Sequence, residues 1–239
     1  FRRNLDVNKP IFIVTDLYQG YSELFEKVFG NKVTHQLCLF HLNKLIVNDF
    51  PRKTTIEQEL VKYKMLNIFY NRDLEIEFLS CLIEEEKIMR QRSGKEYKAW
   101  LKEAMHAFRD FVYKLELKRR REKKNLEQRS YYDAFNNFNC LMKEIDSFER
   151  AVRNRLMVIK KRWPNLTAFY FVDNAPATNN AVENYYSTSL KTHRKNQLEV
   201  PGIEDQMKLS ALKRTGIFGR PEKTLLEAFF MFIPFLDRG

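Results

Sequence analysis

The sequence predicts an α/β protein in which helices dominate. Strands and helices alternate over the first fifty residues or so, which is typical of an α/β core. Residues 52–165 are highly charged and carry apolar side chains at helical spacing. Gly and Pro number seven each among 239 residues, and so few chain breakers favour long helices over a β-sandwich or barrel. We therefore expect a core formed by residues 1–51 and 166–239, interrupted by a large all-α insertion over residues 52–165.

The first part of the core contains two predicted strands. Ile11–Thr15 (IFIVT) is apolar and β-branched, as in a buried strand. Tyr21–Phe29 has helical spacing, and Gly30-Asn31 is a typical helix stop. Val33–Leu39 predicts the second strand, and Phe40–Phe50 the helix after it.

The insertion contains two amphipathic stripes. One helix is predicted around Trp100–Leu115 and another around Phe138–Ile159, because apolar residues recur every three or four positions in both. Packing in a helical bundle accounts for these stripes.

The second part of the core starts near Trp163-Pro164. Ala168–Val172 (AFYFV) predicts a strand that ends at Asp173. A loop rich in Asn, Ala and Pro follows, and residues 180–192 predict a helix that contains Glu183. Further helices are expected towards the C-terminus, over residues 203–213 and in the apolar segment 225–236.

Charge and cysteine content limit the function classes. The formal net charge of +11 favours a polyanion partner, nucleic acid before membrane, although a basic protein without such a partner is the plainer alternative. No apolar run reaches the roughly 18–20 residues of a membrane span. Three cysteines, odd in number and far apart, favour an intracellular setting without disulfides.

Two acidic residues form a candidate metal site. Asp16 directly follows a predicted strand, and ligands bind at the carboxyl ends of strands in open α/β sheets. Glu183 lies in the first turn of a predicted helix. Such a carboxylate pair suits Mg²⁺ or Mn²⁺, and two such ions catalyse phosphodiester chemistry. The plainer alternatives are a turn residue at Asp16 and, at Glu183, a helix-capping role with Asn180.

Three motifs occur in a fixed order along the chain. They are TDLYQGY at residues 15–21, HQLCLFHL at residues 35–42 and TNNAVEN at residues 178–184. Together they resemble the DDE transposases of the insertion-sequence or Mutator-like kind, in which the same elements flank a helical insertion. The resemblance covers about residues 10–50 and 166–215.

The resemblance implies an RNase H-like core and metal-dependent DNA cleavage, followed by strand transfer at transposon ends. Asp16 corresponds to the second catalytic acid and Glu183 to the third, and both would bind Mg²⁺ or Mn²⁺. DNA, as transposon end and target, is the implied partner, and a homo-oligomer is expected. The implied location is intracellular with the DNA, in the cytoplasm or nucleoid or in a nucleus.

The first catalytic Asp of this family has no counterpart before Asp16. Asp6 is the sole acidic residue there, and ten extended residues would separate it from Asp16 by roughly 33 Å. We therefore expect the chain to lack the N-terminal part of the core and a complete two-ion site, to bind metal weakly and to be inactive alone. A DNA-binding or oligomerising transposase remnant without activity is the alternative.

Two basic tracts are candidates for DNA contact. Lys118, Arg119, Arg120 and Arg121 continue the Trp100 helix, and a solvated helix end explains them equally well. The resemblance adds a basic tract after the catalytic Glu, with Lys191, Arg194 and Lys195 as phosphate contacts. Arg194 falls within about 20° of the helical face of Glu183.

Cys38 and His41 have the CxxH spacing of half a zinc site. No second pair has ligand spacing, so we expect no zinc and favour a structural pair. The resemblance places Cys38, His41 and Asn180 next to the catalytic acids in a supporting role.

Overall fold

The structure is a computed structural model, and it describes residues 10–18, 20–122 and 126–179. The chain divides into two compact units, one of residues 1–40 with 172–239 and one of residues 41–171. The boundaries predicted from sequence at 51/52 and 165/166 mark a change in composition, and that division stays a prediction.

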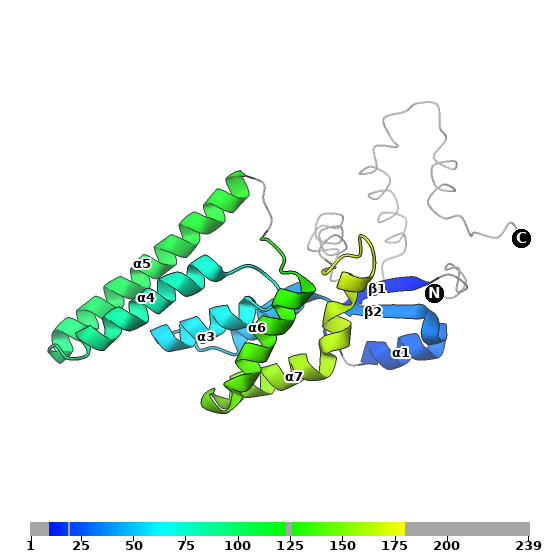
Figure 1. The fold of residues 1–239 in the computed structure, drawn as a ribbon, viewed down its shortest axis with the longest axis horizontal. Coiled ribbons are helices and arrows are strands. Elements are labelled where there is room, and N and C mark those ends of the chain that lie inside the picture. Colours follow the sequence, from blue (N-terminus) through cyan, green and yellow to red (C-terminus); the bar gives the residue numbers. More distant parts are fainter. Residues whose placement is uncertain (1–9, 19, 123–125, 180–239) are drawn as a thin grey trace, which may run out of the picture. The chain divides into compact units, whose positions relative to one another are not determined.

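The first unit contains a strand–helix–strand motif. β1 (Ile11–Thr15) and β2 (Val33–Leu37) are parallel, in a register that pairs Ile11 with Val33 and Thr15 with Leu37. α1 (Gly20–Phe29) and a short 3₁₀ turn, η1 (Gly30–Lys32), connect them (Figure 1). Gly30 ends α1 with a φ of 61°, the left-handed conformation that glycine adopts without strain.

Aromatic packing holds α1 on the sheet. Phe25 and Phe29 are buried, and the ring of Phe25 meets that of His35 on β2 edge-on at 5.1 Å between centroids. Tyr21 stacks on Phe25 at 5.9 Å. These contacts fix the two parallel strands and therefore the edge at which both end.

The second strand is shorter than predicted. β2 ends at Leu37, and α2 (Leu39–Asn48) begins one residue before the predicted helix and ends two residues earlier. The reason is a contact with a residue far away in the sequence, since the Leu39 N–H donates to the carbonyl of Ala177 (3.1 Å) instead of continuing the ladder to β1.

The second unit is helical. After α2 its helices are α3 (Ile56–Leu66), α4 (Asp73–Met89), α5 (Gly94–Arg121), α6 (Tyr131–Lys143) and α7 (Arg150–Thr167), with 3₁₀ turns η2 (Ile145–Ser147) and η3 (Ala168–Phe171). Capping boxes start two of them, Thr55 with Gln58 at α3 and Ser93 with Glu96 at α5.

α4 and α5 form an antiparallel hairpin (Figure 1). Its buried core joins Leu79 and Leu82 of α4 to Ala104, Met105 and Phe108 of α5, with Ile56 of α3 beneath them. Trp100 and Phe111 pack against this cluster, so the stripe predicted around residues 100–115 is confirmed as a core face.

The prediction of a single helix over Phe138–Ile159 is wrong. The segment forms α6, η2 and α7, with extended backbone at Phe148 and Glu149. The Ser147 hydroxyl donates to the carbonyl of Glu144 (2.7 Å), which closes the 3₁₀ turn. The apolar spacing persists because a 3₁₀ turn takes three residues and keeps Ile145 and Phe148 in step.

The strand predicted at Ala168–Val172 is also wrong. α7 continues through Pro164 to Thr167, and residues 168–171 form η3. Tertiary contacts decide this conformation, because the Tyr170 hydroxyl donates to the carbonyl of Arg129 (2.9 Å) and the Phe171 ring contacts Tyr131.

The structure therefore confirms a helix-dominated chain with one small parallel sheet in the described residues. Within those residues, no helix combines the length and the apolar character that crossing a lipid bilayer requires.

Candidate active site

The carboxyl ends of β1 and β2 lie side by side. Thr15 pairs with Leu37, and the next residues along the chain are Asp16 and Cys38. The Cys38 N–H donates to the Thr15 carbonyl at 2.7 Å. This parallel edge is the kind of place where α/β sheets bind ligands.

Asp16 is half-buried at this edge. Its Oδ1 accepts a hydrogen bond from the Tyr18 N–H at 3.1 Å, which makes an Asx turn after the strand. The plainer turn role predicted for Asp16 is thus present. An ionised carboxylate has about four acceptor sites, so this one bond leaves oxygen lone pairs for a cation.

A hydrogen-bonded pair joins the two strands beneath Asp16. The Thr15 hydroxyl lies 2.8 Å from Nε2 of the buried His35, and it also contacts the carbonyl of Asp16 at 2.9 Å. The two contacts connect the Asp16 carbonyl to His35 on β2 through the Thr15 hydroxyl. Thr15 and His35 stand in the motifs quoted above, but the sequence gives no sign that their side chains touch.

Cys38 joins the sheet edge to the loop that leads to Glu183. The fully buried Cys38 thiol donates to Oδ1 of Asn179 at 3.0 Å, and the Asn179 N–H approaches Sγ at 3.5 Å. The Ala177 carbonyl accepts from the Leu39 N–H at 3.1 Å. The second and third motifs, 141 residues apart between Cys38 and Asn179, are therefore in contact at the carboxyl edge of the sheet.

Several predicted site residues lie outside the described residues. These are Glu183, Asn180, Lys191, Arg194 and Lys195. In the described residues 10–18, 20–122 and 126–179, no group of three or more His, Cys, Asp and Glu side chains is placed to hold a metal ion. The pairing of Asp16 with Glu183, and any ion between them, stays a prediction.

The two residues of the CxxH spacing have different surroundings. Cys38 is buried at the sheet edge, while His41 is half-buried on α2. Asp173, considered above as the end of a strand, is exposed in a turn that the Ala175 N–H closes on the Val172 carbonyl at 3.1 Å.

The four basic residues at the end of α5 are not alike. Lys118, Arg120 and Arg121 are exposed, whereas the Arg119 side chain is 20% exposed and forms ion pairs with Glu75 and Glu116. From sequence, the four residues form one cluster. The burial of Glu75, on α4, is the signal that separates them, and no local pattern in the sequence reveals it.

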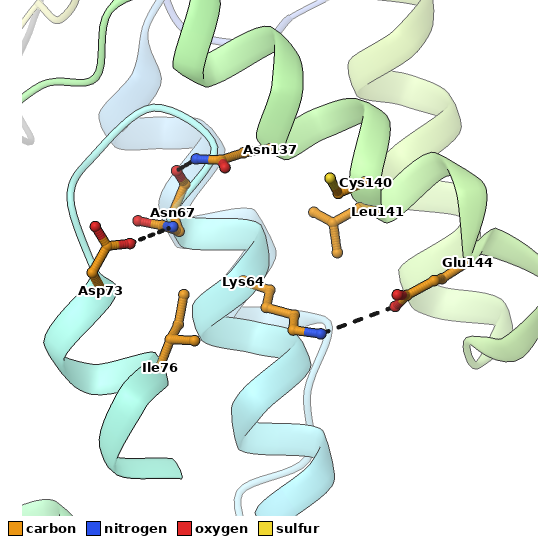
Figure 2. A pocket seen from close by; sticks show the side chains of 8 residues that line it. All are labelled: Lys64, Asn67, Asp73, Ile76, Asn137, Cys140, Leu141 and Glu144. Carbon is orange, nitrogen blue, oxygen red and sulfur yellow. Dashed lines mark hydrogen bonds and ion pairs between the residues drawn. The ribbon is translucent and has the colours of Figure 1, made fainter. Parts of the chain in front are cut away.

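A cavity of about 220 Å³ lies between α3, α4 and α6 (Figure 2). It is lined by Lys64, Asn67, Asp73, Ile76, Asn137, Cys140, Leu141 and Glu144. Its polar groups bond to one another, as Asn67 Nδ2 donates to Asp73 (3.1 Å) and Asn137 Nδ2 to the Asn67 carbonyl (2.9 Å).

A hydrogen bond from Arg129 and its positive charge hold the pKa of Asp73 below its usual range, although partial burial opposes them. These contacts tie three helices together, and we assign this cavity a structural role.

Comparisons of the chain with protein-family models, curated proteins and solved structures found no match.

Proposed function

We propose that this chain is the catalytic domain of a DDE-type transposase with an RNase H-like core. The contact between Cys38 and Asn179 is the observation that carries the proposal. It brings the start of the TNN motif to the edge where Asp16 follows β1, which is where the motif order requires the third acid to arrive.

The donor chemistry of the site fits a hard cation. Asp16 supplies carboxylate oxygens at the strand end, and Glu183 is the second ligand that the motifs imply. When bound there, Mg²⁺ or Mn²⁺ would supply activation of water or of a DNA 3′-hydroxyl. The chain's own part is to hold the carboxylates, through the Asx turn at Asp16 and through the Cys38–Asn179 contact.

The proposed reaction has two steps. Water first hydrolyses a phosphodiester at the transposon end, which leaves a 3′-hydroxyl on the transposon and a 5′-phosphate on the flanking strand. The 3′-hydroxyl then attacks a phosphodiester of the target DNA, forming a new P–O bond while the 3′-oxygen of the target strand leaves as a hydroxyl. The net charge of +11 supports a DNA substrate.

A second candidate is a DNA-binding transposase remnant without activity. The observation that favours it is the turn role of Asp16, whose Oδ1 already accepts a backbone hydrogen bond. Such a turn needs a polar side chain but no metal.

Metal binding by carboxylate variants tests the proposal. Mn²⁺ affinity, measured by calorimetry, should fall at least tenfold in Asp16→Asn and in Glu183→Gln, since removing even a residue that supports a ligand costs about that much. Asp173→Asn, which removes an exposed carboxylate in a turn, is the matched control and should bind as the unmodified chain does. Equal affinity in all four proteins would refute a shared metal site.

Nicking of supercoiled plasmid in Mn²⁺ separates the two candidates when the chain and its variants are fused to an upstream strand segment that carries an acidic residue, because the chain alone is expected to be inactive. Nicking that both site variants abolish and the control retains supports the transposase. DNA binding without nicking in any of these proteins supports the remnant.

A further inference from the structure

The C-terminal end of α5 presents three exposed cations beside one that is used inside the protein. Lys118, Arg120 and Arg121 are exposed and form no ion pair with any residue that the structure describes. Arg119 is the exception, since it contacts two carboxylates.

Arg119 belongs to a buried ion cluster. The Glu75 side chain is 0% exposed, and its Oε1 lies 2.9 Å from Arg72 Nη1 and 3.4 Å from Arg119 Nη1. Glu116 Oε1 bridges the same two guanidinium groups, at 3.3 Å from Arg72 and 2.9 Å from Arg119. A buried carboxylate requires such partners. With two carboxylates and two guanidinium groups, the cluster is formally neutral and adds no net charge to the surface.

The cluster fixes the rotation of the last turns of α5. Glu75 lies on α4, so Arg119 points towards α4. Successive helical residues are about 100° apart around the axis. Lys118 and Arg120 therefore lie about 100° to either side of Arg119, and Arg121 lies about 200° away, so these three side chains project away from α4.

The helix dipole and mutual repulsion act in opposite directions on the three exposed cations. A cation in the last turn gains about 0.3–1 kcal/mol from the helix dipole. Lys118 and Arg121, three residues apart, are neighbours on the helix surface, and like charges at that spacing cost a few tenths of a kcal/mol. A polyanion that neutralises both charges removes this repulsion.

We propose that Lys118, Arg120 and Arg121, the basic end of α5, form a surface that binds the phosphate backbone of double-stranded DNA. Arg119 is a positioning residue that orients this surface and does not contact DNA. The choice of DNA as the polyanion rests on the proposed function, but the surface itself rests on the contacts of α5.

Salt dependence of DNA binding tests the proposal. Fluorescence anisotropy with a 30-base-pair duplex of arbitrary sequence, between 50 and 300 mM KCl, gives the slope of log affinity against log salt. Each phosphate that a cation neutralises adds about 0.9 to the steepness of this slope, so Lys118→Ala, Arg120→Ala and Arg121→Ala combined should flatten it by about 2–3. The matched control combines Lys95→Ala, Lys98→Ala and Lys102→Ala, three exposed lysines at the other end of α5, and should leave the slope unchanged.

Arg119→Ala separates positioning from contact. It should lower the melting temperature, because Glu75 then keeps only one of its two partners. At a temperature where the variant is folded, its slope should match that of the unmodified chain. A flattened slope with an unchanged melting temperature would make Arg119 a phosphate contact and overturn this assignment.

Two further outcomes would overturn the proposal that the basic end of α5 binds DNA. One is an equal slope in the basic-end variant and the lysine control. The other is that the unmodified chain binds anionic phosphatidylserine vesicles but not the duplex, and that the basic-end variant loses this vesicle binding. Neither depends on nicking or on Mn²⁺ affinity, so the proposed function and this surface fail or stand separately.

Discussion

The contact between Cys38 and Asn179 should contribute about 1 kcal/mol to holding the loop on the sheet edge. The thiol is fully buried and donates to Asn179 Oδ1 at 3.0 Å, with a weaker return contact of 3.5 Å from the Asn179 N–H. A typical neutral hydrogen bond contributes about 0.5–1.5 kcal/mol net, and a thiol is a weak donor, so the two contacts together should contribute about 1 kcal/mol. Cys38→Ala and Asn179→Ala should therefore show a coupling energy of that size in a double-mutant cycle.

The Leu39 amide reports this contact directly. Its N–H donates to the Ala177 carbonyl, two residues before Asn179, so it exchanges with solvent when the loop leaves the edge. Removing about 1 kcal/mol should speed its hydrogen exchange about fivefold in either single variant. Cys140→Ala, which removes an exposed thiol on α6, serves as the control. Unchanged Leu39 exchange in both variants, or a coupling energy of zero, would show that the pair does not hold the loop.

Two further predictions concern the helical unit. Phe108→Ala should lower the free energy of unfolding in urea by about 3–5 kcal/mol. The Phe108 ring is 3% exposed, and its centroid lies 5.3 Å from that of Tyr63 and 5.8 Å from that of Phe78. Tyr113→Ala, at an exposed site of the same helix, should change the free energy of unfolding by no more than about 0.5 kcal/mol. Burial, with smaller effects from nearby charges, raises the pKa of Tyr63 to about 12 from an ordinary value of 10. Its contribution to stability, about 2–3 kcal/mol, is therefore fully present below pH 10 and lost as the pH rises towards 12. The free energy of unfolding of Tyr63→Phe should therefore decrease less steeply with pH between about 10 and 12 than that of the unmodified chain. Identical pH profiles for the two proteins would contradict this prediction.

Local patterns were enough to predict the elements that depend on local forces. The strand at Ile11–Thr15 and the helix stop at Gly30 are confirmed, because a β-branched run and a glycine with positive φ leave few choices. The helix with Trp100 and Phe108 on one face is confirmed for the same reason.

The errors come from interactions between distant residues. Aromatic residues at 168–172 favour a strand, but Tyr170 bonds to Arg129 and Phe171 packs on Tyr131 in a 3₁₀ turn. The break between α6 and α7 leaves the apolar spacing intact, so periodicity does not detect it.

The candidate site shows the same limit. Motif order predicted that the segments around Asp16, Cys38 and Asn179 belong together, but neither the thiol–amide contact nor the Thr15–His35 contact has a signal in the sequence. The different surroundings of Arg119 and Arg120 depend on a carboxylate 44 residues away.

The difference in burial among the three cysteines allows opening of the sheet edge to be followed by thiol modification. Cys81 and Cys140 are exposed, while Cys38 is buried. An alkylating reagent needs an accessible thiolate, so it modifies the first two in the folded protein and reaches the third when the edge opens. Mass spectrometry then counts the adducts. Three adducts show that the sheet edge has opened, and two adducts show that it has stayed closed. Reagents placed on Cys81 and Cys140 also leave the proposed catalytic edge unaltered, which makes those two positions the natural attachment points for fluorophores.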